Sequence, residues 1–367
     1  MNIIGLSQAN SGCGYHRVLL PLGFMKDVKA HVTNFITEDK IEGIDIMLYN
    51  RRCIYDANFD EFRRITGSKV VMDIDDYWLL PPNHLLYGEY NKSRYQIENN
   101  IRNADMVTVT NEELRKRVYP LNNNVHVFEN AIPFGHNQFT DERREDDRIR
   151  IFWSGSITHE HDVKMLRGPV QRLLPYADKI KMVIGGYTDE SPLAREIWGR
   201  IFSAFTAGGK LPYAKIHGTS PVQYMQLYEN ADIMVIPLED SDWHACKSNL
   251  KILEAASKRI PVIVSNVRPY NVDKDAPVFW VNSQKDWFFH LKYLILNPEA
   301  RIEYGNKLYD WAKRHYNLED INTRRREAFA NLCGASAHPR VLSEDGRVGE
   351  LSPSHTDGVA DSVPCVV

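Results

Sequence analysis

The sequence predicts an α/β chain made of two parallel-sheet domains, and three stretches lead to this prediction. Two apolar, β-branched runs at residues 233–238 and 261–265 flank a polar loop and a helix, which is the repeating unit of a parallel sheet. Near the start, an apolar run at residues 2–6 leads through a glycine-containing loop into an apolar-periodic helix. Between these regions, residues 135–147 have the polar composition of an interdomain linker.

The composition is typical of a globular protein of this size. The 367 residues suffice for two domains with cores of their own, and 43% of them are hydrophobic. With a formal net charge of −3, no global field attracts the chain to nucleic acid or to an anionic membrane. The five cysteines are widely spaced without metal-type pairs, so we expect reduced thiols and a cytoplasmic protein. We expect no transmembrane segment or signal peptide, because no apolar run approaches about 18 residues.

The first domain is predicted over residues 1–134, as strands that alternate with helices. Its expected strands are residues 2–6, 44–49, 69–72, 104–110 and 125–130, and its expected helices are residues 15–25 and 111–119. The strand at residues 104–110 is expected to end by capping the helix at residues 111–119.

The second domain is predicted over residues 148–332, after the linker at residues 135–147. Its expected strands are residues 148–153, 181–185, 215–218, 233–238, 261–265 and 277–281. Its expected helices are one that reaches residue 176 and those at residues 192–205, 221–228, 286–296 and 298–316, besides the helix after Lys247. The three arginines at residues 324–326 are expected on a solvated helix face. Residues 333–367 have no periodicity and are predicted to be a disordered tail.

The helix after Lys247 is the stretch around which we expect the site to form. Parallel sheets bind ligands at the carboxyl ends of their strands, where helix amino-termini favour anions. Ser248 or Asn249 could cap this helix, while Lys247 and Lys251 add positive charge. Glu254 lies on the same helix face as Lys251 and could accept hydrogen bonds from sugar hydroxyls. The pattern indicates a diphosphate site with a polar acceptor, although solvated lysines and an ordinary surface ion pair would give the same spacing.

The run from Asn249 to Ile263 resembles the donor-binding signature of family-4-like (group 1) GT-B glycosyltransferases. The resemblance implies two Rossmann-like domains facing a cleft, with Glu254 holding ribose or hexose hydroxyls of the donor. Many members have a second glutamate eight residues earlier, where this chain has Cys246. The subtype with an asparagine and then a lysine three residues before the glutamate fits better.

An aspartate-rich stretch follows the expected strand at residues 69–72. Asp73, Asp75 and Asp76 repel one another, so they need solvent, cations or a catalytic role. Asp73 and Asp75 could share a metal ion, or the three could end a strand and cap a helix in solvent. The stretch resembles that of a GT-B subgroup seen in polysaccharide clusters and phage genomes. Many family members have a histidine near here that contacts the donor sugar; Asp75 or Asp76 would take its place, with His84 as a further candidate.

Two glycine-containing loops are candidates for anion binding. Gly12 and Gly14 follow the first strand and could bring backbone amides close to a phosphate, although a tight turn would use the same glycines. The resemblance places this loop across the cleft, with residues 15–17 facing it. After Gly155, family members have an arginine and then a lysine five residues later, where this chain has Ser156 and His161.

These departures shift the expected phosphate contacts to backbone amides, His161, Lys247 and Lys251. A metal bound by His159 and His161 is a rival interpretation that no further ligands support. The predicted donor-binding residues are Gly12, Gly14, Gly155, Ser156, His161, Lys247, Ser248, Asn249, Leu250, Lys251 and Glu254. The predicted acceptor-side residues are Tyr15, Arg17 and His84, and the predicted catalytic residues are His16, Asp75 and Asp76.

The resemblance implies a glycosyltransferase that moves a hexose or pentose from a nucleotide diphosphate sugar, expected to be a UDP-sugar, to an acceptor hydroxyl. Retention of configuration without a metal is expected, Mg²⁺ being possible but not favoured. In an inverting enzyme, Asp75 or Asp76 would be the general base. The acceptor is either a glycan or a hydroxylated base of phage DNA, for which arginines at residues 51–52, 63–64 and 115–117 could supply basic patches. A sugar-nucleotide epimerase and a non-catalytic nucleotide-sugar binder are the alternatives.

Overall fold

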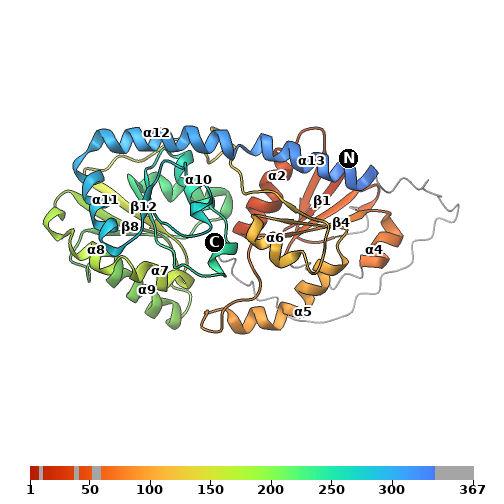
Figure 1. Cartoon of the computed structure of the whole chain (residues 1–367), viewed down its shortest axis with the longest axis horizontal. Coiled ribbons are helices and arrows are strands. Elements are labelled where there is room, and N and C mark those ends of the chain that lie inside the picture. Colours follow the sequence, from red (N-terminus) through yellow and green to blue (C-terminus); the bar gives the residue numbers. More distant parts are fainter. Residues whose placement is uncertain (8–10, 37–40, 52–58, 335–367) are drawn as a thin grey trace.

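Two parallel six-stranded sheets form the frame of the protein in the computed structural model, which describes residues 1–7, 11–36, 41–51 and 59–334. The sheets belong to two lobes that lie side by side along the long axis of the molecule (Figure 1). Within the described residues, the strand order is β2-β1-β3-β4-β5-β6 in the first lobe and β12-β11-β10-β7-β8-β9 in the second. In each lobe the chain order reverses once, between β1 and β3 and between β7 and β10. Such switch points are where open parallel sheets bind ligands.

The first lobe contains the elements up to β6. They are β1 (Asn2–Leu6), α1 (Gly12–Gly14), a π-helix (Tyr15–Leu19), α2 (Leu20–Gly23), β2 (Lys29–Thr33), β3 (Ile46–Asn50), α4 (Phe59–Thr66), β4 (Lys69–Ile74), α5 (Tyr87–Asn103), β5 (Met106–Val109), α6 (Glu112–Val118) and β6 (Val125–Val127). The N-cap of α6 is Asn111, one residue after the expected cap at the end of the strand, and its side chain accepts a hydrogen bond from the Leu114 N–H at 2.8 Å.

The second lobe contains the remaining strands and most of the remaining helices. They are β7 (Ile149–Ser154), α7 (Glu160–Lys164), α8 (Arg167–Gln171), β8 (Ile180–Tyr187), α9 (Pro192–Phe205), β9 (Tyr213–His217), β10 (Ile233–Ile236), α10 (Leu250–Ser257), β11 (Val262–Ser265), β12 (Phe279–Val281), α11 (Gln284–Leu296) and α12 (Pro298–His315). Short 3-10 helices lie at Ile157–His159, Leu174–Tyr176, Pro221–Gln226, Tyr228–Asn230, His244–Cys246 and Tyr270–Val272.

Three predictions of regular structure differ from what the structure contains. The single helix expected to reach residue 176 is interrupted, because Gly168, Pro169 and Pro175 divide the segment into α7, α8 and a 3-10 turn. The helix expected at residues 15–25 includes the π-helical turn, and Pro21, which has no N–H to donate, follows that turn. The amphipathic segment at residues 221–228 is 3-10 rather than α-helical.

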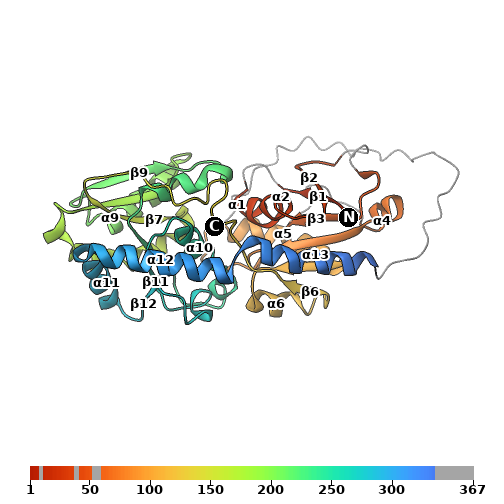
Figure 2. The same ribbon diagram turned by 90° about the horizontal axis from the view of Figure 1, so that it is seen from above.

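The last helix, α13 (Leu318–Gly334), returns to the first lobe. It continues along the same side of the molecule as α12, so that the two helices together span both lobes (Figures 1 and 2). Phe329 packs into the core of the first lobe, and the Asn322 side chain donates to the Pro21 carbonyl at 2.8 Å. Arg325 is 3% exposed, and burial together with the charge of Arg17 lowers its pKa to about 9. The prediction of a solvated arginine face is therefore wrong for Arg325, because that position faces the first lobe.

The chain crosses between the lobes at two places that lie against each other. The Ile132 N–H donates to the Tyr316 carbonyl at 3.0 Å, and the Leu318 N–H donates to the Ile132 carbonyl at 3.1 Å. These bonds form an isolated parallel bridge between Ile132 and Asn317.

The cysteines depart from the expectation of reduced thiols. Cys246 and Cys333 are free, but Cys13 is part of a disulfide. The wide spacing of the cysteines in the sequence did not predict this, because parallel strands can bring distant loops together at one edge of a sheet. The tail predicted to be disordered lies, from residue 335 onward, outside the described residues.

Candidate functional site

A cavity of about 50 Å³ lies between the lobes, where loops follow the carboxyl ends of strands in both sheets. The first lobe lines it with Gly12, Cys13, His16, Arg17, Asp75, Asp76 and Asn130. The second lobe lines it with His159, Lys247, Ser248, Leu250, Lys251 and Tyr270. We call it the cleft cavity. It brings together eight of the residues predicted from the sequence to act on the donor or in catalysis: Gly12, His16, Asp75, Asp76, Lys247, Ser248, Leu250 and Lys251.

Two lysines mark the start of α10. Lys247 precedes the helix and is 7% exposed, while Asn249 holds the N-cap position. Lys251 lies in the first turn, where its Nζ donates to the Ser154 carbonyl at 2.9 Å. Burial, together with the charge of Lys247, lowers the pKa of Lys251 to about 8. Both cations therefore add to the positive end of the helix, which favours a bound anion.

Glu254 lies one turn further along α10 and is 1% exposed. Its Oε2 accepts a hydrogen bond of 2.6 Å from the Tyr228 hydroxyl, and burial and the Glu254 charge raise the pKa of Tyr228, which keeps that hydroxyl a donor. Its Oε1 has no hydrogen-bond partner among the described residues. Nε2 of His16, from the first lobe, is 3.6 Å away, and Nδ1 of His16 likewise lacks a partner within the described chain. Buried polar atoms without partners are costly, so a ligand that supplied hydrogen-bond partners to these two side chains would be bound favourably.

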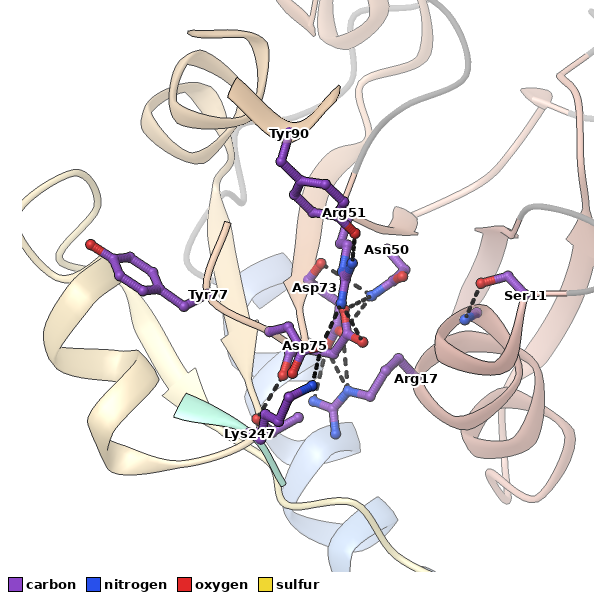
Figure 3. A network of polar contacts seen from close by, with 12 residues as sticks. Ser11, Arg17, Asn50, Arg51, Asp73, Asp75, Tyr77, Tyr90 and Lys247 are labelled. Atoms are coloured by element: carbon purple, nitrogen blue, oxygen red, sulfur yellow. Dashed lines mark hydrogen bonds and ion pairs between the residues drawn. The ribbon is translucent and has the colours of Figure 1, made fainter. Parts of the chain in front are cut away.

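Arg17 and Arg51 hold the aspartates at the end of β4 (Figure 3). Arg17 donates to Asp73 at 2.9–3.2 Å, and Thr108 donates to the same carboxylate at 2.6 Å. Arg51 donates to Asp75 at 2.5 and 3.1 Å and reaches Asp76 at 3.1 Å. Burial alone would raise the pKa of Asp75, but the Arg51 guanidinium outweighs this effect and holds the pKa below its usual range. Asp75 is therefore a weak base in this arrangement.

Polar contacts join the lobes around the cleft cavity. Nζ of Lys247 is 3.5 Å from Oδ2 of Asp76. The Asn130 side chain donates to the Ser248 hydroxyl at 2.8 Å. The Asn111 side chain, besides capping α6, donates to the carbonyls of Cys246 and Lys247 at 3.0 and 2.7 Å.

His159 is a buried member of the cavity wall that the sequence suggested only as a rival metal ligand. Its Nδ1 is 2.7 Å from Oδ2 of Asp162, whose Oδ1 accepts from the Glu239 N–H at 2.8 Å. Burial and the charge of Lys251 lower the pKa of His159 to about 4, so the ring is neutral at pH 7. Among the described residues, no group of three or more His, Cys, Asp and Glu side chains is placed to hold a metal ion.

Several predicted residues lie outside the lining of the cleft cavity. His84 and His161 line a second cavity, which is described below. Tyr15 is buried, and its hydroxyl accepts from Gln138 at 2.8 Å. The Ser156 hydroxyl is 2.7 Å from that of Thr158. The two remaining glycines serve close packing: a Cβ on Gly14 would lie 2.0 Å from Oγ of Ser7, and one on Gly155 would lie 2.7 Å from the Trp153 ring.

Tyr228, Tyr270 and Arg51 complete the surroundings of the site and were not predicted. The sequence places Tyr228 in an amphipathic segment and Arg51 in a local basic patch, and it makes no prediction for Tyr270. The local signal for Arg51 is the group of three carboxylates at and after the end of β4, which require cations nearby.

No protein-family model and no curated protein matches the chain. Solved structures do match. Sucrose-phosphate synthase from Thermosynechococcus elongatus has a TM-score of 0.66 at 12% identity, over 92% of this chain and 100% of that one. HepE from Anabaena, in complex with UDP, has a TM-score of 0.58 at 10% identity, over 90% and 100% of the two chains. TarM from S. aureus has a TM-score of 0.55 at 14% identity; the match covers 79% of this chain but 55% of TarM, so the chain spans about half the length of that protein.

These similarities, with the two parallel six-stranded sheets, show a GT-B fold of two Rossmann-like domains facing a cleft. The fold class predicted from the sequence is confirmed. Within the described part of the chain, no helix is both long enough and apolar enough to cross a membrane.

Proposed function

We propose that the protein is a glycosyltransferase that moves a sugar from a nucleotide diphosphate sugar to an acceptor hydroxyl. The observation that carries this proposal is the geometry at the start of α10, where Lys247 precedes the helix, Lys251 lies in its first turn, and the buried Glu254 carboxylate has one oxygen without a hydrogen bond among the described residues. Ribose hydroxyls donate well to a carboxylate, and a diphosphate suits cations at a helix amino-terminus. The family resemblance and the UDP in the HepE structure favour uridine as the nucleoside of the donor.

The donor is expected to enter through separation of the lobes. The cleft cavity of about 50 Å³ is far smaller than the roughly 300–1,000 Å³ of typical ligand pockets. Side chains of the two lobes contact each other around it. Nε2 of His16 lies near Oε1 of Glu254, and Nζ of Lys247 lies near Oδ2 of Asp76. Opening would expose the Glu254 carboxylate, and closure onto the donor would surround the departing diphosphate with cations and exclude water.

In this proposal the chemistry is mainly electrostatic. Lys247 and Lys251 stabilise the negative charge that develops on the leaving diphosphate, and His16 approaches the donor from the first lobe. We expect retention of configuration and no metal requirement, as the family resemblance implies. Asp76 is the better candidate for a general base in an inverting reaction, because Asp75 is held more tightly by Arg51.

The direct test is thermal unfolding with UDP, GDP, ADP and CMP, followed by measurement of UDP release from UDP-sugars with and without EDTA. A ligand that binds the native state raises the melting temperature. We expect UDP to give the largest shift, and EDTA to leave both shift and turnover unchanged. An epimerase would convert the sugar without any acceptor, and a non-catalytic binder would bind UDP without turnover. No shift with any of the four nucleotides would contradict the proposal.

The low pKa of Lys251 predicts that UDP binding weakens above neutral pH. Lys251 is protonated below its pKa of about 8 and loses its charge as the pH rises through that value. We expect the dissociation constant for UDP, measured by calorimetry, to rise by roughly tenfold between pH 7 and pH 9, since a charge-assisted contact is worth about 1.5–3 kcal/mol.

Two controls separate Lys251 from other titrating groups. Uridine, which has no phosphates, should bind with little change over the same pH range. The Lys251→Met variant should bind UDP weakly at both pH values. A Lys251→Met variant with the parent's pH dependence would show that another group is responsible.

A further inference from the structure

A second cavity, of about 720 Å³, opens beside the cleft cavity. The first lobe contributes parts of residues 77–85 and Arg117, and the second contributes parts of residues 157–162, 193–200 and 239–244. We call it the outer cavity. Three features connect it to the cleft cavity: Asp76 and Tyr77 are consecutive, Asp162 holds His159, and Nζ of Lys247 is 4.6 Å from the centre of the Trp243 ring. In Figure 3, the Tyr77 side chain points away from Asp73 and Asp75.

We propose that the outer cavity receives the acceptor, and that the acceptor is an uncharged glycan rather than DNA. This inference rests on the proposed glycosyltransferase function. Its first support is the charge of the walls. The lining contains four carboxylates and two guanidinium groups, which give a net formal charge of −2. The carboxylates are Glu160, Asp162, Glu239 and Asp242, and the guanidinium groups are Arg117 and Arg200.

The two arginines are already paired with carboxylates of the same cavity. Arg200 donates to Glu160 at 2.6 and 3.0 Å, and Arg117 is 3.6 Å from Asp242. Two histidines of the lining, His84 and His244, add no positive charge at pH 7, because burial lowers the pKa of each to about 4. An acceptor with phosphates would therefore meet excess negative charge at close range, which is unfavourable.

Of these four carboxylates, that of Glu239 is placed to bind a hydroxyl of the acceptor. Glu239 is exposed, and its carboxylate has no hydrogen bond or ion pair to any other described residue. The lining also includes the apolar side chains of Leu79, Leu80, Leu193 and Ile197. A sugar ring has hydroxyls at its edges and a C–H face, so it can donate a hydroxyl to a carboxylate and cover apolar surface with its C–H face.

The arginines that favoured DNA from the sequence are neutralised in the fold. Arg51 is buried against Asp75 and Asp76, and Arg52 lies outside the described residues. The other pairings, each within 4 Å, are Arg63 with Asp60 and Asp105, Arg64 with Glu61, Arg115 with Glu112, Lys116 with Glu113, and Arg117 with Asp242. Each of these cations therefore has a carboxylate nearby that offsets part of its attraction to a polyanion such as DNA.

The experiment measures UDP release from a UDP-sugar with three acceptor classes: neutral oligosaccharides, phosphorylated oligosaccharides, and duplex DNA with hydroxymethylated cytosine. We expect stimulation by neutral oligosaccharides, with an acceptor KM that changes less than about twofold between 50 and 200 mM salt. A phosphate-directed acceptor would lose affinity steeply over that range. UDP binding with stimulation only by anionic acceptors, or by none of the three classes, overturns the inference. Absence of UDP binding would instead overturn the proposed function.

A matched pair of variants tests the outer cavity itself. Glu239→Gln is expected to raise the KM for a neutral acceptor by about tenfold. Asp240→Asn, the exposed neighbour that does not line the cavity, should leave it unchanged. Both variants should bind UDP like the parent, which separates acceptor binding from donor binding. Equal acceptor KM values for the parent and Glu239→Gln would contradict the assignment of the cavity.

Discussion

Replacing Glu254 with glutamine is expected to weaken UDP binding by about 10- to 100-fold while leaving the protein folded. The amide keeps the shape of the side chain and can still accept from the Tyr228 hydroxyl, as Oε2 does now. It removes the charge that would accept the ribose hydroxyls, and hydrogen bonds to charged groups are worth about 1.5–3 kcal/mol each. Titration calorimetry with UDP gives the dissociation constant directly.

The control for Glu254→Gln is Glu303→Gln, on an exposed face of α12 where Glu303 pairs with Lys307. It should change neither UDP binding nor stability. The unfolding temperature of Glu254→Gln should stay at or above that of the parent, because the substitution removes a buried carboxylate with an unpaired oxygen. If Glu254→Gln binds UDP as tightly as the parent, the donor site has been placed wrongly.

Replacing Asp73 with alanine is expected to lower the free energy of unfolding by about 3–5 kcal/mol, the cost of leaving one partner of a buried ion pair uncompensated. Asp73 is 2% exposed and accepts from Arg17, Thr108 and Asn50. Without it, the Arg17 guanidinium keeps its bonds to Phe128 and Asn130 but has lost its counter-charge. Chemical denaturation of parent and variant measures the difference.

An exposed ion pair provides the comparison. Asp60 pairs with Arg63 at 3.1 Å, but its side chain is 92% exposed, so Asp60→Ala should change stability by less than about 0.5 kcal/mol. A similar small loss for Asp73→Ala would mean that the buried network around Arg17 contributes little to the fold.

The sequence predicted most strands because their chemistry is local. Residues 233–236 and 262–265 are apolar, β-branched and fully buried in the structure, as the pattern indicated. β2 was missed because it is an edge strand whose first three residues are exposed and therefore carry no apolar run. α5 was missed for a related reason: only four of its 17 residues are buried, so it lacks a clear apolar stripe.

The candidate site also contains some features that the local sequence predicts and others that depend on the tertiary fold. The sequence could predict that three charged residues lie close together, because they fall within eight residues at and just before α10: Lys247, Lys251 and Glu254. The meeting of His16 with Glu254 depends on how two distant lobes dock, which no local pattern records. The partner of Asp75 shows the same limit, since an arginine after β3 looks like a surface residue until the parallel register of β3 and β4 places it beside the carboxylate.

The bridge between Ile132 and Asn317 restricts how the lobes can move. Because the two connecting segments are hydrogen-bonded to each other, we expect them to bend together as a single hinge when the lobes separate. Sliding one lobe past the other would break these hydrogen bonds, whereas rotation about one axis through the segments would keep them. Such a rotation would bring the same two faces of the lobes back into alignment at each closure.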